Sequence, residues 1–195
     1  MEAQVACIVE GHGEVEAVPI LIHRIAERLE VGIRVLPPLR VPKGKLLRAG
    51  ELERAVELQA RKLAGAGGIA IVIDADDDCP AELGPLLLER AARARSDMSV
   101  AVVLAKRKFE AWFLAAAESL AGHRGLAADL RAPPDPEAIR GAKEWLSARM
   151  QGASAYSETL DQPALAAVLN LDRARRAASF DKFFRELVRL LSTTP

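Results

Sequence analysis

Two short acidic segments each come directly after five apolar residues. The run Val5–Val9 leads into Glu10-Gly11-His12-Gly13-Glu14, and the run Ile69–Ile73 leads into Asp74-Ala75-Asp76-Asp77-Asp78. Unbroken apolar runs of this length favour strands that are buried on both faces. Carboxylates gathered from neighbouring strand ends are ligands that hard divalent cations prefer. The sequence therefore predicts a Mg²⁺ or Mn²⁺ site and, with it, metal-dependent phosphoryl transfer.

The predicted metal ligands are Glu10, Asp74 and Asp76. Neighbouring parallel strands end at the same edge of a sheet, about 4.8 Å apart, so adjacency of the first and third strands would bring these acids together. Asp74 and Asp76 share a face if the strand persists that far, because side chains at i and i+2 point the same way. Such close acids repel and raise one another's pKa, which favours a bound cation. The alternative is that each acid is a loop or helix-cap residue.

A second group of charged residues follows the fourth apolar run. Lys106 and Lys108 come just before Glu110, which opens a predicted helix. We predict that Glu14 and Glu110 act as a general base or as a second metal ligand, and that the lysines contact the reacting phosphate. The alternatives are that the glutamates are first-turn residues favoured by the helix dipole and that the lysines are solvated.

The basic residues after the second strand make nucleic acid a candidate partner. The chain has 27 basic and 27 acidic residues, so no global positive field would attract a polyanion. Binding would instead depend on local clusters such as the basic loop residues Arg40, Lys43, Lys45 and Arg48. The alternative is an ordinary charged surface loop.

Strand and helix patterns alternate through the first 120 residues. This alternation predicts an α/β fold, Rossmann-like, with a mostly parallel sheet of about four strands between helices. The expected strands cover residues 5–9, 33–41, 69–73 and 99–104, and the expected helices 14–29, 51–64, 80–94 and 109–121. Pro37-Pro38 interrupt the second strand, which indicates an edge position or an early end.

The pattern changes after Gly122, where only helices are expected. They cover residues 137–150, 163–169 and 179–191, with Ser179 as the cap of the last one. We therefore expect a core over residues 1–122 and a helical extension over residues 123–195 that packs on it. The extension is a candidate docking site for a protein partner.

Several classes of protein are not expected. Two cysteines make no disulfide framework, and no spacing of Cys and His suggests zinc. No signal peptide and no apolar run of roughly 18 residues is visible, so we expect a cytoplasmic protein without a membrane span.

The order of the acidic motifs resembles that of a toprim domain. Glu10 matches the glutamate after the first toprim strand, and Asp74-Ala75-Asp76 matches the D-x-D after the third. Glu10-Gly11-His12-Gly13-Glu14 resembles the E-G-x-x-E form of OLD-type nucleases. Lys108-Phe109-Glu110-Ala111-Trp112-Phe113 resembles a stretch shared by small bacterial toprim-like proteins. The resemblance covers roughly residues 4–120 and implies Mg²⁺ coordination by the matched acids.

The resemblance favours a metal-dependent nuclease acting on DNA or RNA. Two other functions stay open. The first is a non-catalytic module that binds a metal or a partner protein, which the neutral net charge favours. The second is a hydrolase that acts on a small phosphate ester.

Overall fold

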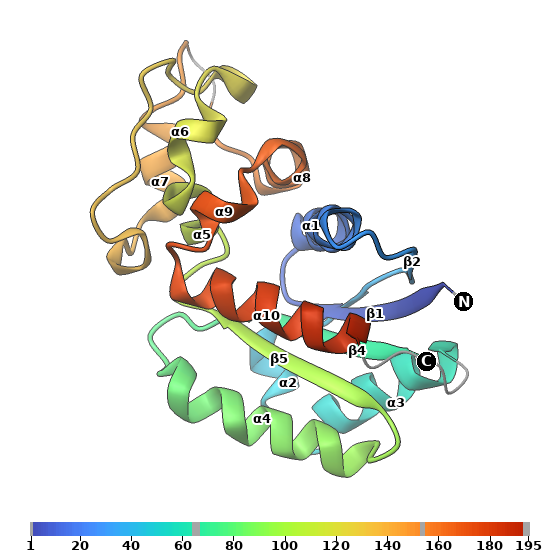
Figure 1. Ribbon diagram of the computed structural model, residues 1–195. Helices are drawn as coiled ribbons and strands as arrows, with labels where there is room; N and C mark the ends of the chain where they lie inside the picture. The colour runs from blue at the N-terminus through green and yellow to red at the C-terminus, as the bar shows by residue number, and fades with distance from the viewer. Residues whose placement is uncertain (1, 64–66, 153–154, 193–195) are drawn as a thin grey trace.

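A parallel sheet forms the centre of the protein. The computed structural model describes residues 2–63, 67–152 and 155–192. The strands are β1 (Ala3–Val9), β2 (Ile33–Val35), β3 (Leu39–Arg40), β4 (Gly68–Asp74) and β5 (Ser99–Ala105). Their order is β2-β1-β4-β5, β3 also pairs with β1, and every pairing is parallel. The predicted α/β fold with a mostly parallel sheet is confirmed (Figure 1).

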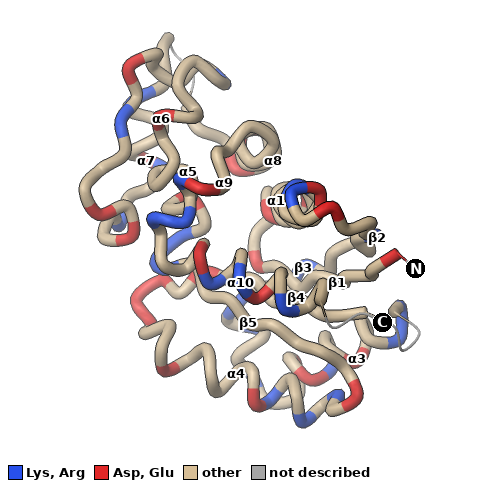
Figure 2. The backbone as a smooth tube through the Cα atoms, viewed as in Figure 1, with Lys and Arg blue, Asp and Glu red and all other residues tan. Residues whose placement is uncertain are grey.

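The two central strands β1 and β4 are buried on both faces. Their side chains alternate between two apolar clusters, so Val5, Cys7 and Val9 face one layer of helices while Ala6 and Ile8 face the other. Strand β4 has no charged residue before Asp74, and β5 has none along its length, which Figure 2 shows as a tan tube. Continuous apolar strands of this kind need helices on both sides of the sheet.

Pro37-Pro38 divide the second predicted strand into β2 and β3. Both pieces pair with β1, which leaves them at the edge of the sheet as predicted. Proline has no N–H to donate to a ladder, which explains the break. The adjacency of β1 and β4, on which the predicted site depends, is also present.

Helices cover both faces of the sheet. On one face lie α1 (Glu14–Arg28) and α10 (Ala178–Ser192), and on the other lie α3 (Glu51–Leu63) and α4 (Pro80–Ala94) (Figure 1). Helix α10 fits closely over β4 and β5. Arg189 donates a 2.7 Å hydrogen bond to the carbonyl of Val100, and a Cβ at Gly68 would lie 2.8 Å from the Leu190 side chain. The last position of the predicted helix 51–64 lies outside the described residues.

The remaining helices are short. They are α2 (Lys43–Leu46), α5 (Ala111–Ala115), α6 (Ala117–Leu120), α7 (Ala142–Ser147), α8 (Glu158–Val168) and α9 (Leu171–Ala174), with 3₁₀ turns at His123–Gly125 and Pro136–Ala138. The predicted helix over 137–150 is wrong, because only one turn and α7 form there. Helix α8 begins at Glu158 and not at residue 163. The boundary at residue 122 stays a prediction, although α8 and α10 share a hydrophobic cluster with β1 and α1.

Trp112 joins the segment after β5 to α10. Its ring stacks on Phe183 at 5.1 Å between centroids and meets Phe180 edge-on at 5.2 Å. Its indole N–H donates a 2.8 Å hydrogen bond to the hydroxyl of Ser179. Ser179 is therefore not the helix cap that we predicted. The carboxylate of Glu137 accepts from the first N–H groups of α10 instead.

Among the described residues, no helix combines the length and the apolar character that crossing a bilayer requires. The cytoplasmic location stays a prediction.

Candidate functional site

The carboxyl ends of β1 and β4 bring Glu10 and Asp74 into direct contact. Val9 pairs with Val72 in the ladder, so both strands end at the same edge. The side-chain Oε2 of Glu10 accepts a 3.1 Å hydrogen bond from the backbone N–H of Asp74. The sequence argument that placed these two acids together therefore holds.

Asp76 reaches the same place by a different route from the one expected. Strand β4 ends at Asp74, and Asp76 lies in a turn with a left-handed φ of 53°. Its backbone N–H donates 3.0 Å to the carbonyl of Arg107, itself left-handed at φ 65°. Left-handed backbone is tolerated by aspartate and is unusual for arginine. The turn thus replaces the continued strand in directing Asp76 toward Asp74.

One ammonium group lies between the two aspartates. Lys108 Nζ is 3.2 Å from Asp74 Oδ2 and 2.5 Å from Asp76 Oδ1. Lys43 lies on the other side of Asp76, at 3.2 Å, and 2.8 Å from Asp78. Lys43 is also buried and donates 2.6 Å to the carbonyl of Ala75. Lys43 therefore lies with the acids at the carboxyl ends of β1 and β4, which are Glu10, Asp74 and Asp76 and which we call the acidic edge. It does not lie in the exposed basic loop in which we expected it.

The two aspartates differ in electrostatic environment. Burial raises the pKa of Asp74 to about 7, and the nearby carboxylates of Glu110 and Glu10 add to this rise against the attraction of Lys108. Partial burial also raises the pKa of Asp76, but hydrogen bonds from Lys108 and Lys43 outweigh it, and its pKa is lowered overall. Ionisation of Asp74 is therefore less favourable in the folded protein than in the unfolded chain, while ionisation of Asp76 is more favourable.

Asp74 is also held by the segment that follows β5. Its Oδ1 accepts a buried 2.8 Å hydrogen bond from the backbone N–H of Phe109. The negative charge of the next residue, Glu110, also raises the pKa of Asp74. The ends of β4 and β5 therefore form one site together with the end of β1.

Glu14 is the first residue of α1 and is buried. Its Oε2 accepts a 3.1 Å hydrogen bond from the backbone N–H of Glu10. Burial raises the pKa of Glu14 to about 8, and the charges of Asp74 and Glu10 contribute, while the N–H groups of Gly11 and Glu10 oppose the rise. Glu14 thus holds its proton more tightly in the folded protein than in the unfolded chain.

Glu110 is completely buried and is held by residues of the helical extension. Its Oε1 accepts hydrogen bonds from Tyr156 Oη at 3.2 Å and from Gln162 Nε2 at 2.8 Å. Its Oε2 is buried, and within the described part of the chain it has no hydrogen-bond partner. One oxygen of this carboxylate is therefore fixed and the other is free to take a ligand.

Sequence reasoning missed Tyr156 and Gln162, which lie 46 and 52 residues from Glu110. Gly13 permits the approach of Gln162. A Cβ at Gly13 would collide with Gln162 Oε1 and with the carbonyl of Glu158. In the segment Glu10-Gly11-His12-Gly13-Glu14, Gly13 was a local signal of a close contact, although the sequence does not say which helix makes that contact.

The other predicted basic residues do not form one cluster. Lys106 is exposed in the turn before Lys108. Arg40 reaches the carbonyl of Glu10 at 3.5 Å, and Lys45 pairs with Glu51 at 3.5 Å. Arg48 is exposed, and its carbonyl accepts a hydrogen bond from Arg90.

The acidic edge has features that suit a cation, although no three His, Cys, Asp or Glu side chains among the described residues are grouped closely enough to form a metal site. Asp74 and Asp76 already converge on one positive charge, that of Lys108. Glu110 Oε2 is a buried acceptor for which the described residues supply no donor. Lysine side chains are flexible, so Lys108 can leave without a change of backbone.

Comparison with known proteins gives a family. A model described as "Domain of unknown function (DUF4276)" matches residues 9–188. The chain belongs to the DUF4276 family. The DUF4276 match runs from the last residue of β1 into α10, so it includes both the acidic edge and the helices that hold Glu110. No curated protein and no solved structure matches the chain.

Proposed function

We propose that this protein is a Mg²⁺- or Mn²⁺-dependent phosphoryl-transfer enzyme, a nuclease that cleaves DNA or RNA. The observation that carries the proposal is that the carboxylates of Asp74 and Asp76 both contact Lys108 Nζ at the end of β4, beside Glu10, whose Oε2 accepts a hydrogen bond from the backbone N–H of Asp74. The resemblance to toprim domains and OLD-type nucleases agrees with this reading of the three acids.

The residues of the site would have different roles in this reaction. Glu10, Asp74 and Asp76 would hold the metal, which when bound activates water and neutralises charge on the phosphate. Glu110 offers its free Oε2 as a further ligand or as the base that takes the proton of water. The buried carboxyl of Glu14 would also accept or donate a proton in this reaction.

The lysines have a second task in this proposal. If Glu10, Asp74 and Asp76 held a metal, Lys108 would be available to pair with the substrate phosphate. Lys106 is exposed beside it and can contact the same group. Both would stabilise the charge that develops on phosphate oxygens as the bond breaks.

Cleavage assays test the proposal. Wild-type protein incubated with single- and double-stranded DNA and RNA should cleave at least one of them with Mg²⁺ or Mn²⁺, and Asp74→Ala should abolish that cleavage. Asp97→Ala is the matched control, because Asp97 is exposed, pairs with Arg95 and lies at the opposite end of β5. Cleavage that persists in Asp74→Ala would exclude the proposed site.

The only tyrosine of the chain, Tyr156, reports on Glu110 without any need for activity. Protein labelled with 3-fluorotyrosine should give a single ¹⁹F resonance. We expect Mg²⁺ to shift this resonance and Mn²⁺ to broaden it, because the phenol bonds to a carboxylate at the metal. Glu110→Gln should remove the Mg²⁺ shift. If calorimetry shows that both ions bind but neither ion changes the wild-type resonance, then Glu110 does not lie at the metal.

A second candidate function is a non-catalytic binding module. The ion pairs of Lys108 with Asp74 and Asp76 favour it, because they neutralise the acids without any metal. The helical extension would then dock a partner protein. Absence of Mg²⁺ and Mn²⁺ binding at millimolar concentration would decide for this function. Turnover of a mononucleotide without cleavage of polymers would instead indicate a hydrolase of small phosphate esters.

A further inference from the structure

A groove of about 620 Å³ lies between the edge strand β3 and helix α3, beside the acidic edge. Its apolar floor includes Leu39 and Val41 from the β3 segment and Leu58 from α3. Leu58 is 46% exposed, although it lies on a helix whose outer face is otherwise charged. An exposed leucine in a concave surface of this size is suited to contact an apolar part of a ligand.

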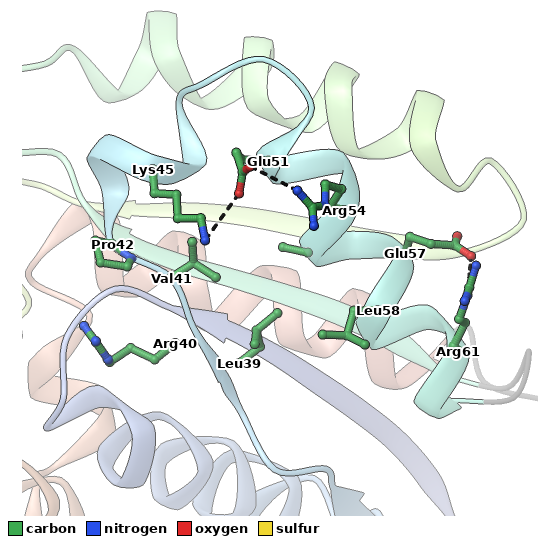
Figure 3. A pocket seen from close by; sticks show the side chains of 11 residues that line it. Leu39, Arg40, Val41, Pro42, Lys45, Glu51, Arg54, Glu57, Leu58 and Arg61 are labelled. Atoms are coloured by element: carbon green, nitrogen blue, oxygen red, sulfur yellow. Dashed lines mark hydrogen bonds and ion pairs between the residues drawn. The ribbon is translucent and has the colours of Figure 1, made fainter.

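Four cations surround this floor, and two acids accompany them. Figure 3 shows Arg40 on β3, Lys45 on α2, and Arg54 and Arg61 on α3, together with the ion pairs that Glu51 and Glu57 make. Arg54, Leu58 and Arg61 share one face of α3, because they are spaced by four and three residues. The groove therefore has an excess of positive charge along an apolar strip.

Arg40 connects the groove to the acidic edge. Its side chain lines the groove, and its guanidinium reaches the carbonyl of Glu10 at 3.5 Å. Three residues further on, Lys43 pairs with Asp76 and Asp78. A ligand lying along the groove would therefore extend directly to the predicted metal ligands.

We infer that this groove binds a single strand of nucleic acid and leads it to the acidic edge, an inference that rests on the proposed nuclease function. The cations would pair with phosphates, and exposed bases would cover the apolar floor. The bases of a duplex are stacked inside it, so they could not contact the apolar floor of the groove. Addition of a peptide strand is disfavoured, because Pro37, Pro38 and Pro42 flank β3 and lack the N–H groups of a pairing edge.

Binding in EDTA tests the inference apart from catalysis. The probe is a short fluorescent oligothymidylate, measured by anisotropy against a duplex of equal length and against polyglutamate. Arg61→Gln and Leu58→Ser should each weaken binding several-fold. Arg61→Gln should also reduce the slope of log affinity against log salt by about 0.7, the value for one phosphate contact of a single strand.

Matched controls exist on α4. Arg93 pairs with an acid one turn earlier, as Arg61 does, and Leu86 is an exposed leucine, at 58% against 46% for Leu58. Arg93→Gln and Leu86→Ser should leave binding unchanged. No binding by the wild type, equal losses in the controls, or tighter binding of the duplex or of polyglutamate would each overturn the inference. Binding of the oligothymidylate without cleavage would support the groove as a binding site and would contradict only the proposed nuclease activity.

Discussion

At about pH 8 and without metal, Asp74→Asn is expected to melt at a higher temperature than the wild type, and Asp76→Asn at a lower one. The mutual repulsion that the sequence predicted for both aspartates would by itself give the same rise for both variants. The structure separates them, because Asp74 is buried among other acids while Asp76 is paired with two lysines. Asparagine at position 74 also keeps an oxygen that can accept from the N–H of Phe109.

The pH dependence follows from the direction of each shift. The pKa of Asp74 rises from its ordinary 3.8 to about 7, so the folded protein binds the extra proton between these values and its stability falls as pH rises through them. The advantage of Asp74→Asn should therefore grow from about pH 4 to about pH 7 and then level off. The pKa of Asp76 is lowered, so its contribution is present above its ordinary pKa and is lost in acid.

The expected gain for Asp74→Asn is on the order of 1–3 kcal/mol. For a domain of this size, each kcal/mol moves the melting temperature by roughly 2–4 °C. Melts of both variants and the wild type in EDTA, at several pH values, measure the effect. Mg²⁺ should stabilise the wild type by about 2.7 kcal/mol at a hundredfold excess over Kd and should not stabilise Asp74→Asn. A variant at position 74 that melts lower in EDTA, with no Mg²⁺ response in either protein, would make these carboxylates structural.

Trp112→Ala should cost about 3–5 kcal/mol of stability, the usual loss for a buried tryptophan. Trp112 is fully buried, contacts Phe109, Phe180 and Phe183, and donates to Ser179. The alanine would leave a cavity between α5 and α10 and a hydroxyl without its donor. Because domains are stable by about 5–15 kcal/mol in total, this one change removes a large fraction.

The second tryptophan of the chain provides the control. Trp145 is only partly buried and lies under the guanidinium of Arg149 at the surface. Trp145→Ala should therefore cost clearly less than Trp112→Ala in urea denaturation. Equal costs would show that the aromatic cluster does not join α10 to the core as strongly as its contacts indicate.

The parallel sheet and the pairing of Glu10 with Asp74 were predictable from the sequence. Both depend on unbroken apolar runs, which report burial on two faces without knowledge of distant contacts. Phe109, Trp112 and Phe113 follow β5 with the i, i+3, i+4 spacing of one helix face, which is typical of core residues, and all three are buried.

The surroundings of Glu110 were not predictable. One of its partners, Gln162, belongs to a helix expected to begin at Pro163, because proline favours a first turn, and the other, Tyr156, precedes that helix. Helix α8 instead begins at Glu158, since Asp161 Oδ2 accepts a 2.7 Å hydrogen bond from the N–H of Ser157 and closes an earlier turn. The extra turn places Gln162 inside the helix and beside Gly13, a contact that no local pattern encodes.

The position of α10 in the chain has a consequence for folding during synthesis. This helix covers β4 and β5, yet residues 106–177 separate it from the end of β5. At about 5–20 residues per second, that face of the sheet stays uncovered on the nascent chain for roughly 4–14 s after β5 is made. An apolar sheet face exposed for seconds is a target for chaperones and for aggregation. Ribosome-bound chains that end before α10 should therefore bind a chaperone more strongly than chains that include it.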